Sequence, residues 1–131
     1  MTETLIKKID LKSGLTLEFI NLSRKIAGDR YLVALMTRIK VPVEKRWFSE
    51  KDLSLTDIAE IRKKVGKAVF FEHKKERNFI DEGQKEEVLN ELIQVAEEYG
   101  VRYLGHPDFP KKLILKKFND KAELSSANAS A

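Results

Sequence analysis

Hydrophobic and polar residues alternate along the first third of the chain, which is the pattern of a half-buried β-strand. Leu15, Leu17 and Phe19 fall on one face of an extended segment, and the residues between them are polar. The run Tyr31–Val41 is apolar on both faces and is therefore expected to be a central strand. With a further strand expected at Thr4–Leu11, the sequence predicts three antiparallel strands in meander order.

The segment between the second and third of these strands is basic and contains a glycine, so the pattern predicts a long β-hairpin with a basic tip. The tip is a candidate site for an anion or another ligand, because cations and exposed backbone N–H groups bind phosphates and carboxylates. Its candidate residues are Arg24, Lys25, Gly28 and Arg30. The alternative is structural: Gly28 and Asp29 form the reversal, and the arginines pair with nearby carboxylates.

Helical spacing replaces alternation after residue 54. A helix is expected to begin at Ser54, with Asp57 completing a capping box, and to stop at Gly66. Lys67–Ile80 is again extended, and its charged second half suits an edge strand protected from aggregation. A second helix is expected from Asp81, with an apolar stripe that ends at a glycine, Gly100.

The end of the chain is less regular. Val101–Leu104 is expected to be a short strand, and Asp108 is expected to cap a last helix, with a strand at Lys112–Phe118 as the alternative. These elements define an α+β fold with an antiparallel sheet of about four strands: an N-terminal three-stranded meander, then helix, strand, helix and a C-terminal helix. We expect a single domain at residues 1–124 and a disordered tail at 125–131.

Composition narrows the class of protein. With 131 residues, 42% of them hydrophobic and 35% charged, the chain is expected to fold around one core. The absence of cysteine excludes disulfides, thiolate metal sites and thiol catalysis, and favours a cytoplasmic location. No apolar run approaches the roughly 20 residues of a membrane span, and no signal peptide is recognisable, so a membrane partner is not expected.

A net charge of +4, from 25 basic and 21 acidic residues, permits nucleic-acid binding without requiring it. Cations are interleaved with aromatic residues near the C-terminus, a pattern that suits phosphate contacts and base stacking. The candidate nucleic-acid-binding residues are Arg102, Lys111, Lys112, Lys116 and Lys117. The alternative is a terminal helix with a buried aromatic side and a solvated lysine side.

Motifs for catalysis are absent from the sequence. His73 and His106 are the two histidines, and neither belongs to a compact metal-ligand motif. There is no nucleophile elbow, phosphate-binding loop or dinucleotide fingerprint, so we expect no catalytic residue, metal or cofactor. An enzyme would need a pocket that gathers one of these histidines with carboxylates and arginines distant in the sequence.

Three functions follow from these observations. The first is a small, non-catalytic cytoplasmic module that binds a ligand or a protein, as a homodimer if the second apolar face of Tyr31–Val41 is covered by another subunit. The second is a nucleic-acid-binding protein that uses the hairpin tip and the C-terminal segment. The third is a small enzyme with a site around His73 or His106.

Overall fold

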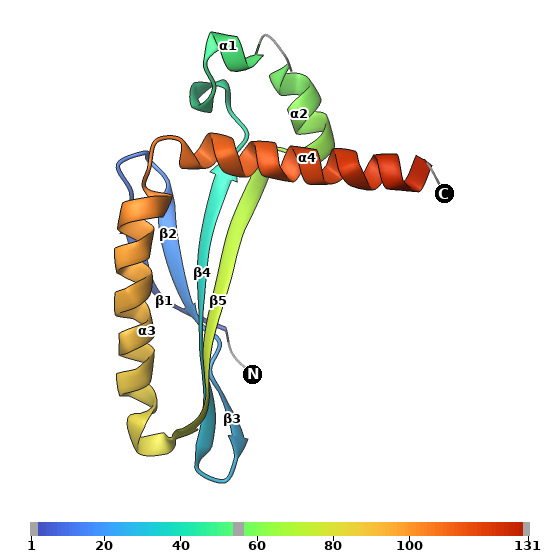
Figure 1. Cartoon of the computed structure of the whole chain (residues 1–131). Helices are drawn as coiled ribbons and strands as arrows, with labels where there is room; N and C mark the ends of the chain where they lie inside the picture. The colour runs from blue at the N-terminus through green and yellow to red at the C-terminus, as the bar shows by residue number, and fades with distance from the viewer. Residues whose placement is uncertain (1–2, 54–56, 130–131) are drawn as a thin grey trace. The chain divides into compact units, whose positions relative to one another are not determined.

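The computed structural model describes residues 3–53 and 57–129, with side chains up to Lys121 (Figure 1). The chain divides into two compact units, each built from two segments. Unit 1 comprises Met1–Ile39 and Phe71–Gly105, and unit 2 comprises Lys40–Phe70 and His106–Ala131. The predicted single domain and C-terminal tail stay predictions.

The sheet has five antiparallel strands, and β4 is its centre because it pairs with β2, β3 and β5. The strands are β1 (Thr4–Asp10), β2 (Thr16–Asn21), β3 (Arg24–Ala27), β4 (Arg30–Pro42) and β5 (Ala68–Asp81). β1 pairs with β2, which completes the predicted N-terminal meander, and β5 pairs with β4 alone. The predicted α+β class is confirmed, and β5 is the expected edge strand.

The predicted long hairpin is present, and it continues further than the alternation indicated. Asn21 pairs with Leu35 and Arg24 pairs with Leu32, so β2 and β3 follow β4 in one register. At the interruption between them, the Ser23 hydroxyl accepts a hydrogen bond of 3.0 Å from a backbone N–H of β4. β2 and β3 therefore form one broken strand, which reconciles about four predicted strands with the five observed.

The basic tip is mostly strand, so its prediction as a connecting segment is wrong. Arg24–Ala27 forms β3, and the reversal itself consists of Gly28 and Asp29 between the paired residues Ala27 and Arg30. Gly28 has φ +56°, as the first central residue of a type II′ turn requires. The residues of the tip have weak strand propensity, but pairing with β4 places them in a strand.

α3 (Lys85–Tyr99) follows a 3₁₀ turn, η2 (Glu82–Gln84), and continues directly into a π-helical turn, η3 (Gly100–Leu104). The predicted end of the α-helix at Gly100 is confirmed, since Gly100 is the C-cap of α3, whereas the predicted strand at residues 101–104 is wrong because these residues belong to η3. Gly100 has helical angles, with φ −60°, and is buried. A Cβ at this position would collide with the Leu17 side chain, so glycine lets the end of α3 pack closely against β2 without displacing Leu17.

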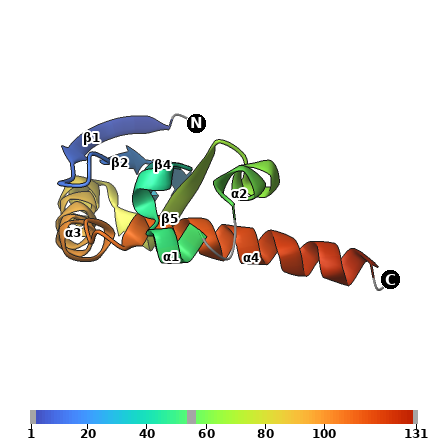
Figure 2. The same cartoon turned by 90° about the horizontal axis from the view of Figure 1, so that it is seen from above.

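In unit 1, α3 runs along one face of the sheet (Figures 1 and 2). That face carries the alternate residues of β2 and β4, which are almost fully buried: Leu17, Phe19, Leu35, Thr37 and Ile39. An exposed ion pair between Lys7 of β1 and Glu97 of α3 joins the helix to the same face. The buried apolar stripe predicted for this helix includes Leu92, which is 3% exposed.

Unit 2 contains η1 (Lys45–Trp47), α1 (Glu50–Leu53), α2 (Ile58–Val65) and α4 (Phe109–Ala129). The predicted last helix is therefore confirmed, and the alternative strand at Lys112–Phe118 is wrong. α2 packs against α4 through a core that includes Ile58, Ile61, Leu113 and Ile114. Among the described residues, no helix is both long and apolar enough to cross a membrane.

Both ends of α2 are capped by the residues around them. The Asp57 side chain accepts a hydrogen bond from the Ala59 N–H, and Gly66 ends the helix with φ +92°. Ser54, the predicted start, lies outside the described residues. Gly66 therefore confirms the predicted C-terminus, and Asp57 serves as N-cap.

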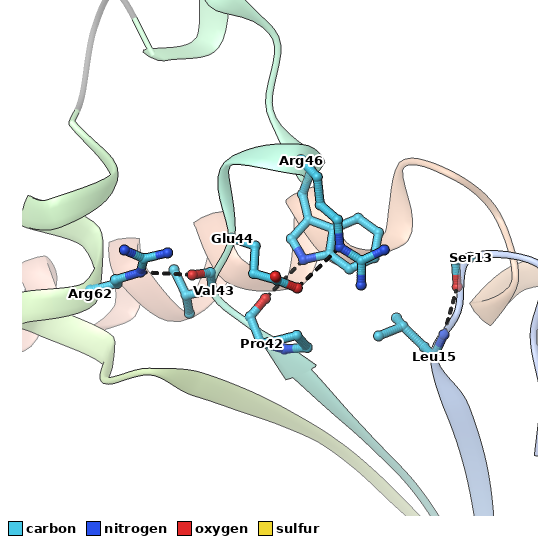
Figure 3. A network of polar contacts seen from close by, with 8 residues as sticks. Ser13, Leu15, Pro42, Val43, Glu44, Arg46 and Arg62 are labelled. Atoms are coloured by element: carbon cyan, nitrogen blue, oxygen red, sulfur yellow. Dashed lines mark hydrogen bonds and ion pairs between the residues drawn. The ribbon is translucent and has the colours of Figure 1, made fainter.

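A network of polar contacts fixes the chain after β4 (Figure 3). The Trp47 indole donates a hydrogen bond of 2.8 Å to the Pro42 carbonyl, and the Arg46 guanidinium lies 3.9 Å from the centre of the indole ring. The Arg62 Nε donates a 2.8 Å hydrogen bond to the Val43 carbonyl. These contacts satisfy two carbonyls at the strand end, where the sheet ladder no longer supplies donors.

Candidate functional site

A cavity of about 270 Å³ opens in unit 1 between α3 and the strands β4 and β5. We call it the α3 pocket. Its lining residues are Leu35, Thr37, Phe71, His73, Lys75, Leu92, Val95, Ala96 and Tyr99.

The residues that line this pocket follow the strand period on β4 and β5 and the helical period on α3. The strand residues are two positions apart on β4 and on β5, so their side chains stand on one face of the sheet. The α3 residues follow the spacing i, i+3, i+4 and i+7, which places them on one helical stripe. Strand alternation and the helical stripe therefore explain which residues line the pocket.

The pocket has an apolar floor and a polar rim. Leu35 and Leu92 are 2% and 3% exposed, and Thr37, 5% exposed, is the buried polar residue beside them. His73 and Lys75 are exposed at the strand side of the rim. On the helix side, the Tyr99 ring is 46% exposed.

This arrangement suits binding better than proton transfer. Among the described residues that line the pocket, none is a carboxylate or an arginine. His73 therefore lacks the acidic partner that would orient it as a general base. Lys75 forms no ion pair among the described side chains and is available to an anionic group on a ligand.

The candidate residues of the hairpin tip differ in their exposure and in their ion pairs. Arg24 and Lys25 are exposed on β3, and Gly28 forms the turn. The Arg30 guanidinium lies 3.2 Å from a carboxylate oxygen of Asp81 and 3.9 Å from one of Asp29. Arg30 therefore has the pairing that the structural alternative expects.

The predicted nucleic-acid-binding residues are divided between the two units. Arg102 belongs to η3 in unit 1, and the four lysines belong to the first turns of α4 in unit 2. Lys111 is half-buried, and its Nζ lies 3.4 Å from a carboxylate oxygen of Asp52. The other three, Lys112, Lys116 and Lys117, are exposed and form no ion pair among the described side chains.

Asp52 of α1 is hydrogen-bonded to Ser49, the residue just before that helix. The Ser49 N–H donates a 2.8 Å hydrogen bond to its carboxylate, and the Ser49 hydroxyl accepts a 3.1 Å bond from the Asp52 N–H. The pKa of Asp52 lies below its usual value, mainly because the Ser49 N–H and then the Ser49 side chain donate hydrogen bonds to the carboxylate, with further contributions from Lys111. The shift belongs to a helix cap at the start of α1.

Neither histidine lies in a metal centre. His106 is in the turn before α4, where its Nδ1 accepts a 3.1 Å hydrogen bond from the Asp108 N–H. Among the described residues, no cluster of three histidine, aspartate or glutamate side chains is placed to hold a metal ion. His73 lines the α3 pocket. The carboxylates and arginines that an enzyme site around this histidine would need are not among the described residues that line the pocket.

Sequence reasoning missed the α3 pocket as a site, although it found most of its walls. The apolar stripe of the second helix and the extended segment around Phe71 were both predicted. The available signal was the polar Thr37 on an otherwise apolar strand face, together with His73 and Lys75 alternating from Phe71. No protein-family model matches the chain, and neither a curated protein nor a solved structure is significantly similar to it.

Proposed function

We propose that this protein is a non-catalytic binding module and that unit 1 holds its ligand in the α3 pocket. The observation that supports this function is an apolar cavity of about 270 Å³ with a cationic rim. Ligand sites are commonly concave and apolar, with a few polar groups that fix orientation, and span roughly 300–1,000 Å³. The cavity lies just below this range, which favours a small ligand.

The rim defines the class of ligand. Lys75 supplies a positive charge, and His73 and the Tyr99 hydroxyl supply hydrogen-bonding groups beside it. An amphipathic carboxylate matches both the floor and the rim of the pocket, because its apolar tail contacts the floor and its carboxylate pairs with Lys75. A medium-chain fatty carboxylate such as decanoate is therefore the appropriate first probe.

The experiment compares decanoate with decanol and decylamine by calorimetry and by amide chemical-shift mapping. We expect decanoate to bind most tightly and to shift the signals of α3 and β5. Ala96→Phe fills the pocket, and Lys75→Gln removes the charge of the rim. Gln94→Phe is the matched control, since Gln94 is exposed on the same helix and does not line the cavity.

Two outcomes would contradict the proposal. Unchanged decanoate binding in folded Ala96→Phe would place the ligand elsewhere, and equal binding of decanol would refute selection for an anion. If Ala96→Phe fails to fold, Val95→Trp replaces it, because Val95 is 49% exposed at the rim and tolerates a larger side chain. Circular dichroism establishes folding in each case.

Self-association and a cytoplasmic location belong to the same proposal. The cysteine-free sequence supports the location. Leu5 and Ile6 support self-association, because they are 45% and 38% exposed on the edge strand β1. Light scattering after gel filtration is expected to give a dimer that Leu5→Lys/Ile6→Lys converts to a monomer, and a monomeric wild-type protein would refute the dimer.

A further inference from the structure

The charges of this protein are divided unequally between its two units. Unit 2 contains 13 lysines and arginines against 8 aspartates and glutamates, whereas unit 1 contains 12 against 13. The whole excess of positive charge therefore belongs to unit 2, which has fewer than half of the residues. A basic helical unit attached to a neutral one is the electrostatic pattern of a polyanion-binding surface.

Five lysines on two packed helices form what we call the lysine surface: Lys63 and Lys64 on α2, and Lys112, Lys116 and Lys117 on α4. The Lys64 Nζ lies 4.9 Å from the centre of the Phe118 ring, which joins the α2 lysines to α4. All five are exposed, and none forms an ion pair among the described side chains. Their charges are thus available to a partner.

Helix stability explains only part of this surface. Lys63 and Lys64 lie in the last turn of α2, where cations complement the helix dipole. Lys112 lies in the first turn of α4, Lys116 in its second and Lys117 at the start of its third. A cation in the first turn of a helix opposes the dipole, and the effect falls off beyond that turn, so the dipole does not account for the lysines of α4.

The surface lacks the apolar residues that a membrane-binding helix inserts. The apolar residues of α4 face the core, with Leu113 8% and Ile114 0% exposed. Among the described side chains of unit 2, Phe70 is the one exposed large hydrophobic residue. Interfacial helices need an exposed apolar face beside their cations, so the lysine surface fits a polyanion in water.

Base stacking is equally unsupported. Phe118 is half-buried beneath Lys64, and the Trp47 ring is covered by Arg46. Single-strand-binding proteins stack bases on open aromatic rings, whereas duplexes present their phosphates on the outside.

We infer that the lysine surface binds the phosphate backbone of double-stranded nucleic acid, without reading base sequence. This site is independent of the α3 pocket. It differs from the predicted one by adding Lys63 and Lys64 and by omitting the hairpin tip, Arg102 and Lys111.

Fluorescence anisotropy of the full chain with labelled duplex DNA and duplex RNA of about 20 base pairs tests the inference. Binding is expected to weaken steeply between about 50 and 200 mM salt, because each neutralised phosphate contributes roughly −0.9 to the slope of log K against log[salt]. Lys112→Gln/Lys116→Gln is expected to lower the affinity roughly tenfold or more and to reduce that slope by about 2. The two duplex arms identify which nucleic acid is preferred.

Arg24→Gln/Lys25→Gln is the matched control, since it removes the same charge from the hairpin tip in unit 1. We expect it to change affinity less than threefold. Loss of binding in this control equal to that in the α4 variant would overturn the assignment, as would binding that salt does not weaken. Binding to vesicles of anionic lipid without binding to either duplex would also overturn it.

Discussion

Gly100 and Leu17 are in such close contact that a side chain at position 100 would overlap the Leu17 methyl group Cδ2. Leu17 is fully buried on β2, and Gly100 is the first residue of the π-helical turn after α3. The helix therefore approaches the sheet at a point where only glycine fits. This contact fixes where the end of α3 lies on the sheet face of unit 1.

Gly100→Ala is accordingly expected to destabilise the protein despite the better helix propensity of alanine. Overpacking of a buried site costs about 1–3 kcal/mol, while replacing glycine by alanine within a helix contributes about 1 kcal/mol. We expect a net loss of up to about 2 kcal/mol in the free energy of unfolding, measured by urea denaturation. A variant as stable as the wild type would show that Leu17 moves aside freely.

A double-mutant cycle with Leu17→Ala isolates this contact. Leu17→Ala alone is expected to cost about 2–5 kcal/mol, because it leaves a cavity in the core. In the truncated background, Gly100→Ala no longer meets the leucine methyl group and is expected to be neutral or stabilising. Strictly additive effects would contradict the proposed overlap.

The strands were predictable because burial on one face imposes a period of two on the sequence. The alternation at Leu15, Leu17 and Phe19 placed β2 correctly, and the apolar run of β4 identified the central strand. The π-helical turn was not predictable, because Gly100 after an apolar stripe resembles an ordinary helix stop. Its true constraint is a tertiary contact with Leu17, which local patterns do not contain.

The α3 pocket was less accessible to sequence reasoning for a related reason. A cavity depends on which part of a sheet face a helix leaves uncovered. Periodicity shows which residues share a face, but it does not show which part of that face the helix will cover. The lysines of α4 were identified as candidates, yet their separation from Arg102 and the pairing of Lys111 with Asp52 depend on tertiary structure. The sequence thus identified the candidate lysines, but it did not identify the residues with which they pair in the folded protein.

Gly28→Ala tests the turn of the hairpin. Gly28 has φ +56°, and a Cβ there would meet no atom within 4 Å, so the cost is confined to the backbone. We expect a loss of about 1–2 kcal/mol in unfolding free energy, and a smaller loss for Gly28→Asn, since asparagine tolerates positive φ. Urea denaturation of both variants provides the measurement, and an Asn variant less stable than the Ala variant would contradict this account.

Trp47→Phe tests the anchor after β4. Phenylalanine keeps a ring for Arg46 but loses the hydrogen bond to the Pro42 carbonyl, so we expect a cost of about 1 kcal/mol. Trp47→Leu removes the ring as well and is expected to cost about 0.5–1 kcal/mol more through the lost cation–π contact. Thermal and urea unfolding followed by circular dichroism measure both, and equal costs would argue against a role for Arg46.

Asp52 makes the stability of unit 2 depend on pH. Its folded pKa is lowered below the usual 3.8, principally by the hydrogen bonds from Ser49. At neutral pH the carboxylate is charged in the folded and unfolded states, so its stabilising effect is complete there. That effect is lost as the pH falls from about 3.8 through the lower folded pKa, because the folded state must then take up the proton it had excluded.

Carbon-13 NMR of the Asp52 carboxyl group measures this pKa directly. Ser49→Ala is expected to raise the pKa of Asp52 only part of the way to the ordinary value, because it removes the hydrogen bond from the Ser49 side chain and keeps the larger contribution of the Ser49 N–H. Lys111→Met is also expected to raise this pKa, because it removes the hydrogen bond and the positive charge of Lys111. In Asp52→Asn, the stability difference from the wild type should shrink as the solution is acidified. A wild-type pKa at or above the ordinary value would refute the shift itself, and an unchanged pKa in Ser49→Ala would show that the Ser49 side chain does not contribute to it.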